Sequence, residues 1–343
     1  MAKARHKEKT LRIALVGGET LLGREIREVL ESRDTGASIT AYASSGEGNF
    51  SEQEGEAVYV EPLELRSVRE DEAILIAGSA EGAQKAYEIS KKVGGKPLLI
   101  DCTGHLENRP EARIVAPLME RADVYASSVL VIAHPAASAL ALVLTKLAKY
   151  RRIQRSVGHV FEPASERGKR GVSELHQQTT SLLSFKALEK KVFDAQLSFN
   201  LLSQYGEDAP DQLSTVEQRI DRHIATILSR GHAEPAVPMP SLRVVQAPVF
   251  HGYSLSLWVQ FDDDIAVPDL GEALASAQIE VRGENEAVPD SVGAVSQSGL
   301  MAGDIRVDRN NARAAWFWVV ADNLRLTADA AAEVISGLRT EQE

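Results

Sequence analysis

The residues best placed for chemistry lie at a strand-to-helix junction within Val129–Tyr150. Val129–Ile132 is a short apolar run of strand type, and apolar positions between Leu140 and Leu147 recur at helical spacing. A tight turn of this kind exposes one side chain above the unpaired N–H groups of the helix start, where enzymes often hold a nucleophile. The exposed candidates in this turn are Ala136, Ala137 and Ser138.

Of these three residues only Ser138 carries a reactive oxygen, for which His134 or His251 would be the base. A serine at the start of a helix is first of all a capping residue, and we expect Ser138 to be one. His251 would share a strand face with Tyr253, and we expect it at a surface or an interface. Cys102 follows a strand in a βα-type turn, where we expect a packed small residue and not a thiol nucleophile.

A second candidate site lies near the N-terminus, where the apolar strand Leu11–Gly17 runs into a glycine turn and a helix. A helix start of this kind can hold a phosphate, because it offers free N–H groups and a partial positive charge. Thr20 occupies the usual middle glycine position, which normally lets the backbone approach a pyrophosphate. The pattern fits nucleotide binding and a plain βα turn equally. The candidate cofactor-binding residues are Gly17, Gly18, Thr20, Leu21, Leu22, Gly23, Ser44 and Ser45.

The end of the next strand, Ser38–Ala43, is where an acidic residue would hold a ribose 2′-hydroxyl. Ser44, Ser45 and Gly46 stand there instead. The missing carboxylate removes the usual obstacle to a 2′-phosphate, but no arginine replaces it. The choice between NAD and NADP therefore stays open.

The first part of the chain alternates strands with helices. Further strands are expected at Glu72–Gly78 and Lys96–Asp101, with a helix between them over Ser79–Lys92. This alternation predicts an α/β fold with a Rossmann-like, doubly wound parallel sheet.

The pattern of strands and helices changes after the strand-to-helix junction at Val129–Tyr150, called the hinge below. Arg243–Phe250 and Ser254–Phe261 are typical of antiparallel strands around His251-Gly252-Tyr253, and a helix is expected at Leu324–Leu338. We predict a second α+β domain with a mixed or antiparallel sheet, whose free face can pack on another subunit. Trp316 and Trp318 alternate with a phenylalanine, which favours a strand buried on both faces over a binding platform.

Length, charge and cysteine content narrow the function classes. The 343 residues favour two domains, and the net charge of −11 argues against nucleic-acid binding. One cysteine excludes an intramolecular disulfide, and no apolar run is long enough to span a bilayer, so a cytoplasmic location is the default expectation. The eight histidines show no metal-ligand spacing, and we expect no metal site.

The motifs, taken in order, resemble the aspartate-semialdehyde dehydrogenase family over nearly the whole chain. They are IALVGGETLLG near the start, IDCTG at Ile100–Gly104, the strand–proline–helix hinge, GVSELHQQT at Gly171–Thr179, FNLL at Phe199–Leu202, QAPVFHGYS at Gln246–Ser254 and WVVADNLR at Trp318–Arg325. The resemblance implies a Rossmann-type domain over residues 1–132 that binds NADP or NAD and is completed by a C-terminal helix at 322–343. It also implies a domain over 133–321 for catalysis and dimerisation.

The family reduces an acyl phosphate to an aldehyde through a cysteine thioester. Where its hinge reads NPNC, this chain has HPAA, so Ala137 stands at the place of the nucleophile and cannot form a thioester. Tyr253 stands for the acid/base histidine, and a phenol of pKa about 10 is a poor substitute. Gln246 replaces the arginine that clamps the substrate carboxylate, and Glu162 replaces a glutamine near the nucleophile.

Two further family positions also differ. The phosphate-binding arginine matches Glu107, which would repel a phosphate, and a Glu-x-x-Lys pair aligns with His223 and Thr226. These losses all fall on the reacting centre, while the scaffold motifs remain. The closest resemblance is therefore to divergent paralogues without the catalytic cysteine.

The leading hypothesis is a cytoplasmic homodimer that has lost this activity and serves as a binding or regulatory protein. One alternative is an active NAD(P)-dependent oxidoreductase that acts on a different substrate with Ser138 and a local histidine. Another is a heteromer with an active paralogue.

Overall fold

The computed structural model describes residues 10–33, 35–53, 56–93, 97–120, 127–230 and 234–340. These residues form two compact units. The first comprises the described residues of Met1–Pro117, Arg121–Ile132 and Ala330–Glu343, and the second comprises those of Leu118–Glu120 and Ala133–Asp329.

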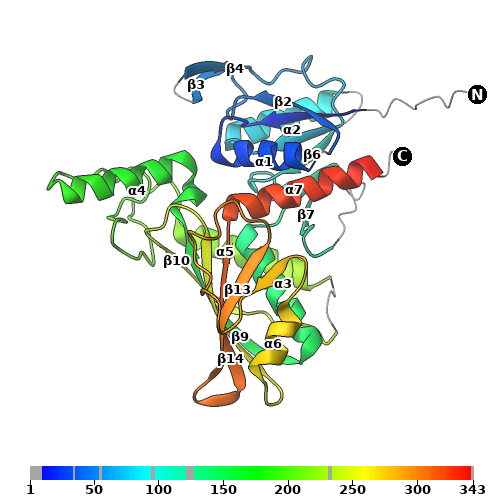
Figure 1. The fold of residues 1–343 in the computed structure, drawn as a ribbon. Helices are drawn as coiled ribbons and strands as arrows, with labels where there is room; N and C mark the ends of the chain where they lie inside the picture. The colour runs from blue at the N-terminus through cyan, green and yellow to red at the C-terminus, as the bar shows by residue number, and fades with distance from the viewer. Residues whose placement is uncertain are drawn as a thin grey trace, which may run out of the picture. The chain divides into compact units, whose positions relative to one another are not determined.

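The first unit is built on a six-stranded sheet with the order β2-β1-β5-β6-β8-β7 (Figure 1). Every pair of neighbouring strands in it is parallel, so the predicted Rossmann-like sheet is confirmed. The strands are β1 (Leu11–Val16), β2 (Ala37–Tyr42), β5 (Ala73–Ile76), β6 (Leu98–Asp101), β7 (Ala112–Val115) and β8 (Val129–Ile132), with the separate hairpin β3 (Asn49–Gln53) and β4 (Glu56–Val60). The helices are α1 (Leu21–Ser32) and α2 (Ala80–Lys92).

Buried apolar strands hold this sheet together. All four residues of β5 and of β8 are buried, as expected for parallel strands covered on both faces. Cys102 is buried just beyond β6, and burial raises the pKa of its thiol well above the usual range. The expectation of a packed, unreactive cysteine is therefore confirmed.

The second unit contains a mixed six-stranded sheet with the order β10-β9-β11-β14-β13-β12. Its strands are β9 (Ile153–Glu162), β10 (Ser241–Gln246), β11 (Tyr253–Phe261), β12 (Ile279–Val281), β13 (Leu300–Asp308) and β14 (Asn311–Ala321). Its helices are α3 (Pro135–Tyr150), the 3₁₀ turn η1 (Ala164–Arg167), α4 (Gly168–Leu183), α5 (Leu213–Leu228), α6 (Val267–Leu274) and the first turns of α7 (Asn323–Thr340).

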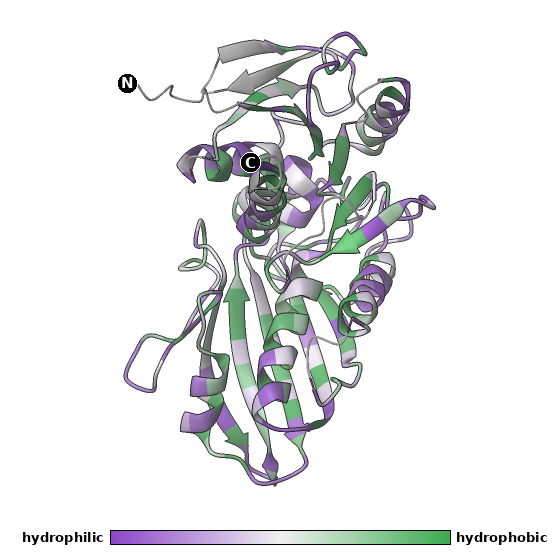
Figure 2. Ribbon diagram, turned by 90° about the vertical axis from the view of Figure 1, so that its right-hand side faces the viewer, coloured by the Kyte–Doolittle hydropathy of each residue, from purple (hydrophilic) through white to green (hydrophobic). Residues whose placement is uncertain are grey.

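The sheet buries one face and leaves the other more open. Residues of β11 alternate strictly between buried and half-buried, and the buried set joins a core with α3, α5 and α6. Along the strands of the second sheet, hydrophobic bands are interrupted by pale and hydrophilic ones (Figure 2). This alternation is the expected pattern for a sheet covered on one side only.

One strand prediction for this unit was wrong. β10 ends at Gln246 and runs parallel to β9, whereas β11 pairs antiparallel with β9 on the other side. The two strands therefore do not form a hairpin around His251-Gly252-Tyr253. Pro248 lacks the N–H that a continued ladder would need, which is a physical reason for the early end of β10.

No described helix is long and apolar enough to cross a membrane. In the same ranges, no group of three or more His, Cys, Asp or Glu side chains is arranged to hold a metal ion.

The β1–α1 turn generates the first prediction. A Cβ on Gly23 of α1 would lie 2.0 Å from the carbonyl oxygen of Gly17, whereas a Cβ on Gly271 of α6 would lie no closer than 3.7 Å to Val281. Gly23→Ala should lower the free energy of unfolding by about 2 kcal/mol or more, because backbone must move. Gly271→Ala, the matched control, should leave stability unchanged or raise it by up to about 1 kcal/mol. Urea unfolding followed by circular dichroism measures both, and equal effects would contradict the close approach.

Candidate functional site

The hinge residues are buried within the start of α3. Ala136 and Ala137 have no exposed surface and Ser138 is 6% exposed, so the prediction that this turn exposes them was wrong. Ser138 is not a cap either: α3 begins at Pro135, His134 is its N-cap residue, and the Ser138 N–H donates to the His134 carbonyl within the helix. Proline at the first helical position starts the helix four residues earlier than a cap at Ser138 would.

An ion pair is buried at the end of β9. Arg167 Nη2 donates to Glu162 Oε1 at 2.7 Å, and the Glu162 side chain has no exposed surface. Burial raises the pKa of Glu162 to about 7, although the charge of Arg167 opposes this shift. Desolvation alone would lower the pKa of Arg167, but the charge of Glu162 raises it above its usual range. Both effects follow from placing this pair out of reach of water.

Gln246 is held by three hydrogen bonds. Its Oε1 accepts from the Tyr205 hydroxyl at 2.6 Å, and its Nε2 donates to the carbonyl oxygens of Glu162 at 2.7 Å and Ala247 at 3.1 Å. Arg167 also lies over the Tyr205 ring, with its Cζ 5.6 Å from the ring centroid. The residue at the place of the family's arginine therefore binds the protein itself.

Tyr253 begins β11 and is 1% exposed. Its hydroxyl is buried near the Glu166 carboxylate and has no hydrogen-bond partner of good geometry among the described residues. Burial, followed by the charges of Glu166 and Glu162, raises its pKa well above the usual range. The phenol therefore keeps its proton at neutral pH.

Glu166 connects several elements of the second unit. Its Oε1 accepts from Asn323 Nδ2 at 2.8 Å, and its Oε2 lies 3.8 Å from His134 Nε2. Burial, and then His223, lower the pKa of His134 well below its usual range, so this histidine is neutral at neutral pH. The backbone N–H of His134 donates to His223 Nδ1 at 2.8 Å.

The predicted positions divide into two groups. Ala137, Glu162, Gln246, Tyr253 and His223 all lie in the second unit, and all except Ala137 take part in these polar contacts. Two residues do not join them. Thr226 is half-buried and its hydroxyl donates to the carbonyl of Arg222, and Glu107 belongs to the first unit.

Sequence reasoning missed four residues of this cluster: Glu166, Arg167, Tyr205 and Asn323. The two adjacent charges of SER in FEPASERG, just after an apolar strand, were a usable signal. Tyr205 and Asn323 carried no local signal, since their partners lie 41 and 157 residues away in the chain.

Several buried polar atoms of the cluster have no hydrogen bond of good geometry among the described residues. They are His134 Nδ1, Glu162 Oε2, Arg167 Nε and Tyr253 OH. Ordered water or a small polar ligand usually satisfies such atoms. The cluster can thus bind polar groups, but Ala137 offers no atom for covalent catalysis.

The glycine turn of the first unit keeps the geometry of a dinucleotide-binding turn. Gly17 has φ +90°, and a Cβ there would lie 2.6 Å from Gly78 N. Thr20 caps α1: its Oγ1 accepts from the Gly23 N–H at 2.9 Å and lies 2.8 Å from the Gly17 carbonyl oxygen. Thr20 is thus turned into the protein, away from the N–H groups of Leu21 and Leu22, which have no acceptor within the helix.

The other predicted cofactor residues lie beside this turn. The N–H groups of Gly17 and Gly18 donate to the Tyr42 carbonyl at the end of β2. Ser44 follows, and its carbonyl accepts from the Ser79 N–H at 2.9 Å. Ser45 Oγ accepts from the N–H of Glu47 at 3.2 Å. These residues fit a nucleotide in shape, because the close backbone approaches at Gly17 and Gly23 are in place.

Comparison with known proteins supports the family resemblance. Residues 147–326 match the family model described as semialdehyde dehydrogenase, dimerisation domain. A USG-1 protein homolog of Azotobacter vinelandii is 28% identical over 321 residues, covering 91% of this chain and 93% of that protein. The solved structure of a probable aspartate-semialdehyde dehydrogenase from Pseudomonas aeruginosa is 26% identical, with a TM-score of 0.78 and coverage of 96% and 98%.

A more distant structure shows the same fold. It is aspartate semialdehyde dehydrogenase with NADP from Candida albicans, 14% identical, with a TM-score of 0.67 and coverage of 97% of this chain and 99% of that one. The family model covers more than half of the sequence and the motifs agree with it. This chain belongs to the semialdehyde dehydrogenase family.

Proposed function

We propose that this chain is a homodimeric binding or regulatory member of its family that has lost the family's thioester chemistry. The observation that carries the proposal is Ala137, buried at the nucleophile's place, together with the ion pair between Glu162 and Arg167. A methyl group offers neither lone pair nor leaving group, so no acyl intermediate forms there.

The ion pair also opposes the binding of a family substrate. A substrate carboxylate would need a free cation, but the Arg167 guanidinium is held by Glu162 at 2.7 Å. Breaking a buried pair by removing one partner costs about 3–5 kcal/mol. An anion would have to offset that cost before it gained any affinity.

The buried polar atoms without a hydrogen bond of good geometry favour non-covalent ligand binding over covalent catalysis. Their donors and acceptors suit a small molecule with hydroxyl or amide groups, or ordered water. The alternative of an active enzyme that uses Ser138 finds no support, because no hydrogen bond joins the Ser138 side chain to His134 or His251 among the described residues.

In this proposal residues 1–132 and 322–343 form the nucleotide-binding domain, and residues 133–321 form the dimerisation domain. The β1–α1 turn would hold the pyrophosphate of NAD or NADP through the N–H groups of Leu21 and Leu22. When bound, the nicotinamide supplies hydride-transfer chemistry, which this chain has no partner residue to use. The dinucleotide then serves as a ligand that stabilises the fold.

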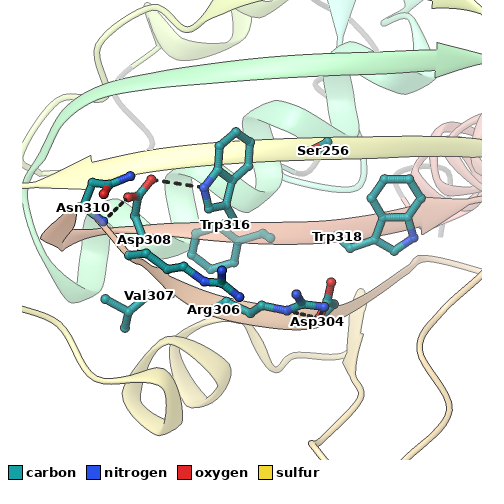
Figure 3. A pocket seen from close by; sticks show the side chains of 10 residues that line it. Ser256, Asp304, Arg306, Val307, Asp308, Asn310, Trp316 and Trp318 are labelled. Atoms are coloured by element: carbon teal, nitrogen blue, oxygen red, sulfur yellow. Dashed lines mark hydrogen bonds and ion pairs between the residues drawn. The ribbon is translucent and has the colours of Figure 1, made fainter.

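The open face of the second sheet supports the homodimer. Trp258 and Trp316 are cross-strand partners there, and the two indole N–H groups donate to the same Asp308 carboxylate. Trp316 is 39% exposed in the single chain, so the expectation of a strand buried on both faces was wrong. Beside it lies a hollow of about 480 Å³ that includes Trp318 and the Asp304–Arg306 pair (Figure 3). Exposed indoles of this kind are frequent in interface cores.

Absence of turnover is the direct test. The wild-type protein should show no NADP- or NAD-dependent oxidation of aspartate semialdehyde with phosphate, measured by absorbance at the nicotinamide band. Ala137→Cys alone should also be inactive, because Tyr253 cannot act as a base near neutral pH. Turnover above that of a mock preparation in either protein would disprove the proposal. A family member with an intact cysteine is the positive control.

The buried pair predicts a pH dependence of stability. The pKa of Glu162 rises from 4.5 to about 7 in the folded chain, so the folded state binds its proton more tightly than the unfolded state. The resulting stability is complete below pH 4.5 and is lost as the pH rises through about 7. The free energy of unfolding should fall by about 1–3 kcal/mol across this window. Glu162→Gln should flatten the plot of the free energy of unfolding against pH, which chemical denaturation at several pH values measures. The exposed-site control Glu31→Gln should keep the wild-type slope. Equal slopes for Glu162→Gln and the wild type would refute the assignment of this pH dependence to Glu162.

The open sheet face predicts the oligomeric state. Trp316→Asp should raise the dimer dissociation constant about 30-fold or more, as expected for loss of a central tryptophan. Val267→Asp, on α6 among the helices of the other face, should leave it unchanged. Analytical ultracentrifugation of both variants and the wild type measures this. A wild-type monomer would contradict the homodimer and would leave pairing with a paralogue as the alternative to examine.

A further inference from the structure

Glu19 places a carboxylate at the end of β2, although the residues that follow β2 are serines. The side chain comes from the β1–α1 turn, between Gly18 and Thr20, and its Oε1 accepts from the Ser44 N–H at 2.7 Å. In dinucleotide-binding folds an acid at this place accepts a hydrogen bond from the adenosine ribose. The position of the acid is therefore filled from another part of the chain.

The second oxygen of this carboxylate lacks a hydrogen-bond donor among the described residues. Glu19 Oε2 is buried and has no hydrogen-bond partner within the described ranges. An ionised carboxylate can only accept hydrogen bonds, and leaving a buried acceptor unpaired costs free energy. A hydroxyl group from a ligand would remove that cost, whereas a phosphate ester has no proton to give at neutral pH.

The backbone that donates to the Glu19 carboxylate is itself anchored. The Ser44 carbonyl accepts from the Ser79 N–H at 2.9 Å, and a Cβ on Gly78 would lie only 2.4 Å from that carbonyl oxygen. The loop after β2 is thus pressed against the start of α2. Ser44 in turn holds Glu19 Oε1 through its N–H.

Two cations near this turn, Lys85 and Arg27, do not neutralise the Glu19 carboxylate. Lys85 Nζ donates to the Gly46 carbonyl at 2.8 Å and pairs with Glu47 at 2.6 Å. Arg27 lies near Gly18, with Nη2 3.5 Å from the place of a Cβ on that glycine, beside the pyrophosphate end of the turn. Neither contacts the Glu19 carboxylate in the described structure.

We propose that Glu19 accepts a hydrogen bond from the ribose 2′-hydroxyl and makes this chain select NAD over NADP. This inference rests on the proposed function, since it requires a dinucleotide in the β1–α1 turn. A 2′-phosphate would bring about two negative charges against the carboxylate and would replace the donor with acceptors only. Glu19 would thus decide the choice between NAD and NADP that the serines after β2 leave open.

Isothermal titration calorimetry of the intact protein with NAD⁺ and with NADP⁺ tests this. The wild type should bind NAD⁺ about tenfold more tightly than NADP⁺ or better, because like charges meet in the NADP⁺ complex. Glu19→Gln keeps the side-chain shape and removes the charge, and should reduce the ratio to about threefold or less. Glu31→Gln, an equal charge change at the exposed end of α1, should keep the wild-type ratio.

The outcomes separate the two proposals. Tighter binding of NADP⁺ by the wild type, or an unchanged ratio in Glu19→Gln, would overturn the role of Glu19 while leaving dinucleotide binding intact. Failure of the wild type and of Glu19→Gln to bind either nucleotide would overturn dinucleotide binding and this inference together. Circular dichroism of each variant checks that the fold is retained.

Discussion

The buried ion pair between Glu162 and Arg167 sets the character of the second unit. The pair lies where β9 passes into η1, and it fixes the direction in which the chain leaves the sheet. A lone carboxylate or guanidinium at this depth would be strongly unfavourable, so each residue requires the other. Tyr205 and Gln246 then surround the pair with hydrogen bonds and a ring face, and they connect β10 to it. In the proposed function, the same pair withholds the Arg167 guanidinium from a substrate carboxylate.

Burial explains why the carboxyl groups of this cluster titrate above their usual range. Two buried carboxylates, Glu162 and Glu166, lie near the guanidinium of Arg167, and the charge of Arg219 also acts on Glu166. Glu166 takes its direct hydrogen bond from a neutral amide, Asn323, and lies 3.8 Å from a neutral His134. Because burial disfavours net charge, the cluster holds a proton more tightly than isolated carboxylates do. A site organised in this way responds to pH through stability, whereas catalysis would need a group poised beside a reacting atom.

Much of the fold followed from local patterns, but the site did not. The apolar strands, the glycine turn at Gly17 and the alternation in β11 are local signals, and the structure contains all three. The start of α3 was misjudged because Pro135 begins the helix before Ser138 can cap it. The contacts of Glu166 and Tyr205 join residues far apart in sequence, and only the packed sheet brings them together. The contact of Glu19 with the backbone after β2 could not be predicted for the same reason, since Ser44 lies 25 residues away in sequence.

The residue type at one position therefore predicts ligand binding less well than the hydrogen bonds that the residue already makes. Ser44 after β2 suggested tolerance of a 2′-phosphate, yet its N–H is already bonded to Glu19. Thr20 at a glycine position left nucleotide binding and a plain βα turn equally open, and its hydroxyl is directed inward as a helix cap. In the second unit Gln246 could in principle bind a ligand, yet its amide is fully used by the protein. A polar group that is hydrogen-bonded within the protein stabilises the fold and is not available to a ligand. A buried polar group without a partner, such as Glu19 Oε2, would gain a hydrogen bond from a ligand that donates one.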